Sequence, residues 1–376
     1  MKRLMKAELA QGIEQRAAAD LALGNIGGAS VLVAQDGEVL YKNHFGTADL
    51  CEAPITDNTL FRLASMTKPI TAVAAMILVE RGLLSLEDTV DRYYPSFYPV
   101  RVRNADGSRT PTDKKVTIKN ILTHSAGILS GVVEKETASA ITDADRSCVE
   151  SYVDFILRQP LSFVPGTAQE YSGTGAFSVL TGIIQKITGM PYGEFLKKEI
   201  FDPCDMQDTT FEPSFAQWDR LIAMHNKKEG KSVVGKTNAG CVFTNIPARN
   251  HLGGAGLISS LGDYYNFAQM LLGGGEFNEK RILSAESIAL LSSPQFPKRE
   301  EVAWGLGVRV IIDEKLSGLP YKTFGWSGAY GTHFWIDPQN RIIAIYLKNS
   351  HYDGGSGAIT AKNFEKDVYA ALETSP

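Results

Sequence analysis

The hydrophobic pattern predicts a helix and a hairpin near the start of the chain and a second helix after them. The sequence of residues 3–24 predicts a helix. Residues 29–34 and 38–41 then flank an Asp36-Gly37 turn, which is a strong signal for an antiparallel β-hairpin. Residues 66–81 place apolar side chains on one helical face, so this segment is predicted to be a core-facing helix.

From about 90 to 290 the pattern is mainly helical, and after 300 it returns to strands. The predicted helices of the middle region are 118–122, 148–157, 178–188 and 261–272. The predicted strands that follow are 305–312, 333–336 and 342–348, and an amphipathic helix over 358–372 ends the chain.

Because β elements lie at both ends, we expect an α/β (α+β) fold. This fold would contain an antiparallel sheet that is built from both chain termini and flanked by helices, together with an all-α insertion domain. Residues 1–90 and 290–376 would form the α/β domain and residues 91–289 the mostly helical domain, with the active site in the cleft between them. A chain of 376 residues that is 44% hydrophobic is long enough for such a two-part core.

Charge and composition exclude several classes of partner. The formal net charge is −4, and no run of five or six charges of one sign occurs, so nucleic acid and anionic membrane are not expected partners. The longest apolar stretch, residues 70–79, is too short to cross a bilayer, and the first residues resemble no signal peptide. A cytoplasmic location is therefore expected, or a periplasmic or secreted one if an export signal has been removed.

The cysteines and histidines give no sign of a metal site. The four cysteines are far apart in sequence, so they are read as reduced and mostly buried thiols, and no close His, Cys and carboxylate spacing occurs. No metal and no cofactor are therefore expected. The cysteines are Cys51, Cys148, Cys204 and Cys241.

Ser65-Met66-Thr67-Lys68 is the only Ser-x-x-Lys sequence in the chain, and it opens the helix predicted over 66–81. Side chains three residues apart lie on the same helical face, so the Lys68 amine can reach the Ser65 hydroxyl. Burial disfavours the charged form of a lysine, and a neutral Lys68 would accept the hydroxyl proton of Ser65. The structural alternative is that Ser65 caps the helix and Lys68 is solvated.

The segment around Ser-x-x-Lys and three further segments resemble the serine β-lactamase-like superfamily, in particular class C β-lactamases, D,D-peptidases (penicillin-binding proteins) and family VIII carboxylesterases. Residues 63–68 resemble the nucleophile motif of this superfamily, and residues 121–127 resemble its Leu-Leu-Thr-His segment. Residues 165–173 resemble the segment that ends in its Tyr-x-Asn motif, and residues 324–329 stand where its Lys-Thr-Gly strand is expected. The resemblance extends over essentially the whole chain and implies a β-lactamase/transpeptidase-like fold. It implies that Ser65 is the acyl-accepting nucleophile, that Lys68 and Tyr171 transfer the proton, and that the backbone N–H groups of Ser65 and Ala329 form the oxyanion hole.

The departures from the family pattern concern the substrate. Trp326 replaces the lysine of the third motif, and Gly173 replaces the asparagine that would hold an acylamino side chain. Both changes point to a carboxylesterase of the family VIII kind, acting on short-chain neutral esters with weak or no β-lactamase activity. Trp326, Ser327, Gly328 and Gly173 are the expected substrate-binding residues. His333 and His124 are expected to pack against the site residues without contacting the substrate.

Other activities stay open on the sequence alone. A D-amino-acid peptidase or amidase, a β-lactamase, or an inactive binding relative would keep the same fold. An α/β-hydrolase is disfavoured, because the Gly325-Trp326-Ser327-Gly328-Ala329 segment is followed by strand-like sequence rather than a helix. The expected partner is a small-molecule ester or amide, and nothing in the sequence indicates an oligomeric state.

Overall fold

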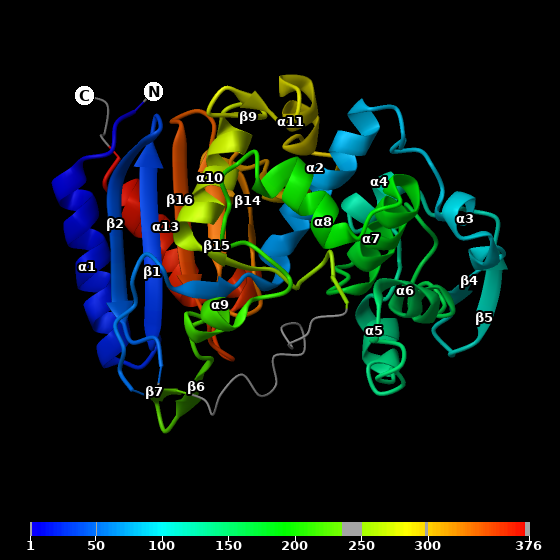
Figure 1. The fold of residues 1–376 in the computed structure, drawn as a ribbon, viewed down its shortest axis with the longest axis horizontal. Coiled ribbons are helices and arrows are strands. Elements are labelled where there is room, and N and C mark those ends of the chain that lie inside the picture. The colour runs from blue at the N-terminus through cyan, green and yellow to red at the C-terminus, as the bar shows by residue number, and fades with distance from the viewer. Residues whose placement is uncertain (1, 50, 235–249, 298–299, 373–376) are drawn as a thin grey trace.

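The structure is a computed structural model that describes residues 2–49, 51–234, 250–297 and 300–372. Within these residues the main element is an eight-stranded antiparallel sheet with strand order β11-β12-β13-β14-β15-β16-β1-β2 (Figure 1). Strand β1 pairs with β16 along its length, with Val31 opposite Tyr346. The predicted α/β fold, with an antiparallel sheet built from both chain termini, is confirmed. The strands are β1 (Gly28–Gln35), β2 (Glu38–Gly46), β11 (Phe296–Pro297), β12 (Val302–Trp304), β13 (Arg309–Ile311), β14 (Phe324–Ser327), β15 (His333–Asp337) and β16 (Ile342–Lys348).

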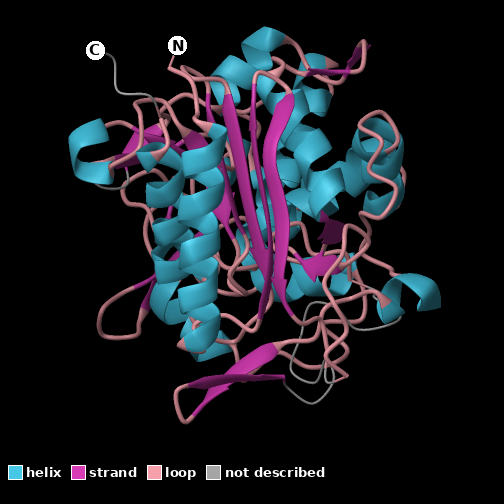
Figure 2. Cartoon of the chain, turned by 90° about the vertical axis from the view of Figure 1, so that its left-hand side faces the viewer, coloured by secondary structure: helices cyan, strands magenta, loops and turns pink. Residues whose placement is uncertain are grey.

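Helices cover both faces of this sheet (Figure 2). Alternation along β1 explains the two faces, because successive side chains of a strand point in opposite directions. Val31 and Val33 join the core cluster that contains residues of α1 (Lys6–Ala22) and α13 (Ile359–Ala370). Leu32 and Ala34 join the larger cluster that contains α2 (Thr67–Glu80) and α10 (Leu261–Leu272). The sheet is therefore buried on both sides.

Helix α2 is more deeply buried than its sequence pattern predicts. Every residue from Thr67 to Leu78 is buried, so the helix has no solvent face along that length. It packs on α7 (Gly175–Thr188), which places it between the sheet and the helical part of the molecule. A helix in such a position needs apolar residues all round rather than along one stripe.

One predicted strand is interrupted. The segment predicted as a single strand over 305–312 instead leaves β12 at Trp304, turns, and begins β13 at Arg309. Gly307 has a φ of +73°, a left-handed conformation that favours glycine, and the N–H of Gly305 donates to the carbonyl of Val308. The turn makes Trp304 and Arg309 cross-strand partners, which matters for the site described below.

The middle of the chain is mainly helical, as expected. Helix α10 belongs by number to this region but contacts β1 and β16 of the sheet, so the limits given for the two domains stay a prediction. The remaining helices are α3 (Val90–Tyr93), α4 (Ile118–Leu122), α5 (Gly131–Thr137), α6 (Val149–Leu157), α8 (Tyr192–Leu196), α9 (Phe215–Asp219), α11 (Ala285–Leu291) and α12 (Glu314–Ser317). Four small hairpins or pairs complete the described residues: β3 (Leu60–Arg62) with β8 (Ile258–Ser260), β4 (Val100–Arg103) with β5 (Arg109–Thr112), β6 (His225–Lys228) with β7 (Lys231–Val234), and β9 (Glu276–Phe277) with β10 (Lys280–Arg281).

Three of the four cysteines lie in the part of the chain that the structure describes, and all three are free thiols. Cys204 is buried, Cys148 is partly buried and Cys51 is exposed, so the prediction of mostly buried thiols is wrong for two of them. Cys241 lies outside the described residues. No helix in the described segments is both long and apolar enough to span a membrane.

Candidate active site

Ser65 lies at the junction between β3 and α2. The chain leaves β3 at Arg62, forms a 3-10 turn over Ala64–Met66 and enters α2 at Thr67, so Ser65 precedes the α-helix instead of standing in its first turn. Ala64 has a φ of +47°, a left-handed conformation that residues with a side chain adopt rarely. Backbone strain of this kind clusters at functional sites, where surrounding structure holds it in place.

The amine of Lys68 is completely buried and directed at Ser65. Its Nζ lies 3.3 Å from the Ser65 Oγ and donates hydrogen bonds to the carbonyl oxygens of Gly173, at 2.6 Å, and Gly254, at 2.8 Å. The Nζ also donates to the Ser65 Oγ, so its three N–H groups are directed at this hydroxyl and the two carbonyls. The solvated lysine of the structural alternative is therefore wrong.

Tyr171 approaches Ser65 from the loop that precedes α7. Its hydroxyl donates to the Ser65 Oγ at 2.5 Å, and the Lys68 Nζ lies 4.8 Å from the centre of its ring. The tyrosine is 38% exposed, so one side of it faces solvent while its hydroxyl faces the serine. The structure thus brings Ser65, Lys68 and Tyr171 together from segments that lie over a hundred residues apart in sequence.

These groups open onto a cavity of about 310 Å³. Its wall is aromatic: the rings of Trp304 and Trp326 lie 5.0 Å apart, and that of Tyr171 lies 6.1 Å from Trp326. Trp304, which the sequence analysis missed, is held by a hydrogen bond from its indole N–H to the Gln169 side chain at 2.6 Å. The lining residues are Ser65, Tyr171, Trp304, Arg309, Trp326, Ser327, Ala329, Gly355 and Ser356.

Ala329 lies in this cavity wall, two residues after the end of β14. In the described part of the chain no group accepts a hydrogen bond from its N–H. Gly328 does not line the cavity. A Cβ at this position would lie 2.3 Å from the Leu63 carbonyl oxygen and 2.1 Å from the Thr332 Oγ1, so the position has no room for a side chain. The glycine thus lets the strand end approach the backbone just before Ser65. This close approach positions Ala329 beside the nucleophile.

Gly173 also lies outside the cavity lining, and its environment involves a residue that the sequence analysis missed. Its N–H donates to Glu134 Oε1 at 3.1 Å while its carbonyl binds Lys68. A Cβ at Gly173 would lie 2.7 Å from Glu134 Oε1, so the carboxylate fills the space that an asparagine would need. Burial raises the pKa of Glu134, against the opposing effects of the Gly173 N–H and the Lys68 charge.

His124 lies behind Tyr171 and packs against the aromatic wall. Its ring centre is 4.8 Å from that of Tyr171, 4.6 Å from Trp304 and 5.6 Å from Trp326. Its Nδ1 accepts from the Ser172 N–H at 3.4 Å, and the residue is almost completely buried with a φ of +54°. His124 thus packs behind Tyr171 and against both tryptophans of the cavity wall.

Ser327 is hydrogen-bonded to a buried histidine, which in turn is hydrogen-bonded to a glutamate. Ser327 and His333 are opposite each other on β14 and β15, and the Ser327 Oγ lies 2.8 Å from the His333 Nδ1. The other ring nitrogen lies 2.8 Å from the Glu365 carboxylate on α13. The cross-strand position of His333 follows from the register, but Glu365 was not predicted because a helix far along the chain supplies it.

Arg309 places a cation in the cavity wall that the sequence analysis did not foresee. The motif position holds Trp326 as expected, but the neighbouring strand supplies the arginine, which pairs in register with Gly325. Its guanidinium donates to Glu365 at 3.2 Å. Burial raises the pKa of Glu365, but the His333 hydrogen bond and charge, together with the charge of Arg309, outweigh it and bring that pKa below its usual value. The Arg309 charge is therefore paired within the protein.

Throughout the described segments no group of three or more His, Cys, Asp or Glu side chains is arranged to hold a metal ion. The chemistry available at Ser65 is instead that of a serine nucleophile with an adjacent amine and phenol.

The sequence matches the family profile described as Beta-lactamase over residues 13–364. The chain belongs to the β-lactamase family. The resemblance inferred from the motifs is thereby confirmed, and the protein is an enzyme, a serine hydrolase of the β-lactamase fold.

Relatives of this β-lactamase family member include esterases. The chain is 30% identical over 364 residues to Esterase EstB of Burkholderia gladioli, covering 89% of this chain and 88% of that protein. It is 31% identical over 351 residues to Protein Rv1367c of Mycobacterium tuberculosis, covering 86% of each. Among solved structures it is similar to EstCE1, described as a hydrolase with promiscuous acyltransferase activity, with a TM-score of 0.83, 26% identity and coverage of 97% and 99%.

Proposed function

We propose that this serine hydrolase is a carboxylesterase that cleaves short-chain neutral esters through an acyl-enzyme on Ser65. The observation that carries the proposal is the convergence of the buried Lys68 amine and the Tyr171 phenol on one hydroxyl at the edge of an aromatic cavity. Its similarity to an esterase, EstB, supports the same reaction.

The acylation step follows from this geometry. The Lys68 amine accepts the Ser65 proton as the Ser65 oxygen attacks the ester carbonyl carbon. The N–H groups of Ser65 and Ala329 stabilise the negative charge on the carbonyl oxygen. When the ester C–O bond breaks, the departing alkoxide takes a proton from Tyr171, and the Lys68 ammonium returns its proton to Tyr171. Water then attacks the acyl carbon and gives a proton to the same pair. As the bond from the acyl carbon to the Ser65 oxygen breaks, the pair returns this proton to that oxygen, and the acid leaves.

The size and charge of the cavity support small, uncharged acyl groups. A volume of about 310 Å³ stands at the lower end of the range of roughly 300–1,000 Å³ usual for ligand pockets. Trp304 and Trp326 offer apolar surface, and Arg309 is paired with Glu365. The ester group next to Ser65 therefore meets no unpaired charge on this wall.

The same residues argue against efficient β-lactam turnover. Trp326 supplies no cation for the carboxylate of a β-lactam, and Gly173 supplies no side-chain amide because Glu134 occupies that space. We therefore expect weak or no β-lactamase activity and weak D-amino-acid peptidase activity.

Labelling with a fluorophosphonate followed by peptide mass spectrometry tests the nucleophile. The adduct is expected on Ser65, and Ser65→Ala should abolish it. Ser327→Ala is the matched control, because Ser327 lines the same cavity and has a histidine partner. An adduct on Ser327, or none in a folded protein, would refute the assignment.

A substrate panel tests the specificity. Initial rates are measured with 4-nitrophenyl esters from acetate to decanoate, a chromogenic cephalosporin and a D-alanyl-D-alanine peptide. The proposal expects the highest kcat/KM for the short esters and a steep fall with chain length. Faster turnover of the cephalosporin or the peptide than of every ester would contradict it.

A further inference from the structure

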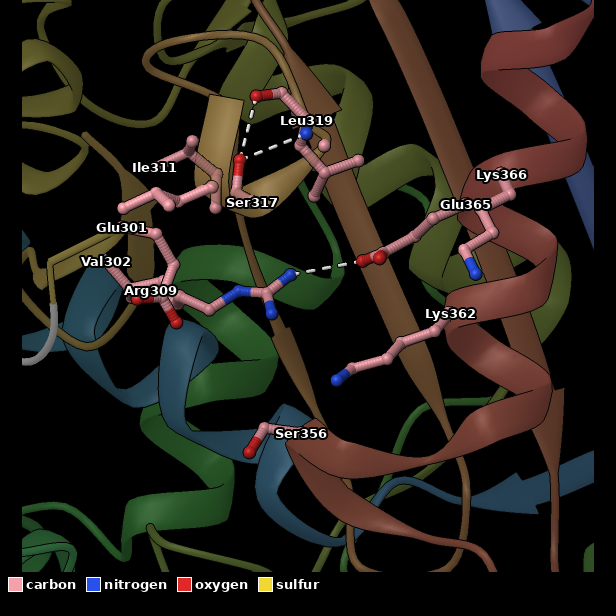
Figure 3. Close-up of a pocket in the computed structure, with 12 residues that line it drawn as sticks. Glu301, Val302, Arg309, Ile311, Ser317, Leu319, Ser356, Lys362, Glu365 and Lys366 are labelled. Carbon is pink, nitrogen blue, oxygen red and sulfur yellow. Dashed lines mark hydrogen bonds and ion pairs between the residues drawn. The ribbon is translucent and has the colours of Figure 1, made fainter. Parts of the chain in front are cut away.

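A second cavity adjoins the catalytic one. It has a volume of about 210 Å³ and lies between β13, the segment that follows it and helix α13 (Figure 3). Arg309 and Ser356 line both cavities, so the two are neighbours across these side chains. A substrate whose ester group lies at Ser65 can therefore extend past Arg309 into the second cavity.

The second cavity carries an excess of positive charge. Arg309 is balanced by Glu365, and Glu301 also has an interaction of its own. Lys362 and Lys366 remain, and among the described residues neither forms an ion pair. Figure 3 shows Lys362 extending from α13 into the cavity toward Arg309. This local excess stands against a chain whose net charge is −4.

The spacing of the two lysines makes their arrangement unfavourable without a ligand. They are four residues apart on α13, so they lie on the same helical face, where like charges repel each other. An anion between them would remove that repulsion and use the ammonium groups as hydrogen-bond donors. The Ser356 hydroxyl is a further polar group on the wall shared with the catalytic cavity.

We infer that this second cavity is a subsite for a carboxylate that the substrate carries away from its ester group. The inference rests on the proposed esterase function and adds to it the substrate class: an ester whose reacting end is neutral and whose far end is a carboxylate. The first N–H groups of α13 already donate to the Asp353 carboxylate, so the two lysines rather than the helix N-terminus would bind the anion.

Two matched substrate pairs test the subsite. One pair has the charge on the acyl side, 4-nitrophenyl hydrogen adipate against its methyl ester. The other has it on the alcohol side, 4-acetoxybenzoate against its methyl ester. The wild-type enzyme is expected to prefer the anion of at least one pair, and that pair identifies the side of the ester that enters the subsite. The preference should weaken as ionic strength rises, because salt screens exposed charges.

The variant K362Q/K366Q should lower the ratio of kcat/KM for the anionic over the neutral ester by about three- to tenfold. The variant K362E/K366E should reverse the preference. The matched control is K228Q/K231Q, which removes two exposed lysines from the β6–β7 hairpin and should leave the ratio unchanged. An equal fall in the control, or a ratio that neither lysine variant alters, would overturn the subsite while leaving the esterase proposal intact. No hydrolysis of any of the four esters by folded wild-type protein would overturn both.

Discussion

Lys68→Met separates the chemical role of the buried amine from its structural role. Methionine has a similar length and fills most of the same space, so the variant creates no large cavity. It removes the group that accepts the Ser65 proton, and loss of a general base costs about 10²- to 10⁴-fold in rate. We therefore expect the acylation rate, measured as the pre-steady-state release of 4-nitrophenol from 4-nitrophenyl acetate, to fall by about three orders of magnitude.

The same substitution has a structural cost that can be worked out from the contacts. Lys68 donates to the carbonyl oxygens of Gly173 and Gly254, and both lose their donor. An unsatisfied buried group costs about 1–3 kcal/mol, so two of them lower the free energy of unfolding by about 2–6 kcal/mol. The better burial of the apolar methionine offsets part of this loss, and we expect about 2–4 kcal/mol in urea denaturation.

Thr71→Val is the matched control for this loss of stability. Thr71 lies one turn further along α2, donates to the Gly253 carbonyl at 2.6 Å and accepts from Tyr192 at 2.7 Å. Its replacement also leaves two buried groups unpaired but does not touch Ser65. We expect a comparable loss of stability with acylation within a few-fold of the wild-type rate. If Lys68→Met kept most of the acylation rate, the amine would not be the base and the proposed mechanism would fail.

Three further outcomes follow from the site and its surroundings. The folded state holds the pKa of Glu365 below its usual 4.5, so the ionised carboxylate stabilises the fold above that pH, and this stabilisation is lost as the pH falls through the lowered pKa. Glu365→Gln should therefore flatten acid denaturation curves below pH 4.5. Burial raises the pKa of Glu134, so its ionisation at neutral pH destabilises the fold. Glu134→Gln should therefore raise the free energy of unfolding at pH 7.5 and have little effect at pH 4. The opposite order would contradict a raised pKa for Glu134. Gly328→Ala would push a methyl group against the Leu63 carbonyl and shift Ala329, so kcat for 4-nitrophenyl acetate should fall about tenfold or more. An unchanged kcat would show that the Ala329 N–H does not stabilise the oxyanion.

The residues that could be predicted from sequence are those whose neighbours are set by local geometry or by a motif. Ser65 and Lys68 are three residues apart at the start of a helix, so their contact follows from helical spacing. The hairpin around Asp36-Gly37 follows from alternation and its turn. The resemblance to a known family added Tyr171, which no local pattern connects with Ser65.

The residues that were missed reach the site through tertiary contacts alone. Glu134 enters from α5 and fills the space beside Gly173, and Glu365 enters from α13 to pair with Arg309. Neither carries a sequence signal, because a glutamate on an amphipathic helix ordinarily faces water. For Trp304 and Arg309 a signal existed: two glycines in the four residues between them indicate a turn, which a continuous strand over 305–312 ignored.

The pairing of β1 with β16 has a consequence for how the enzyme is made. Residues such as Ala29 and Lys348 meet in register although more than three hundred residues separate them, so the centre of the sheet cannot close until the ribosome has released most of the polypeptide. Until then β1 presents an unpaired apolar edge during synthesis. Newly made chains should therefore depend on chaperones and be prone to aggregation when translation stops early, and hydrolytic activity should appear only after the last strand has emerged.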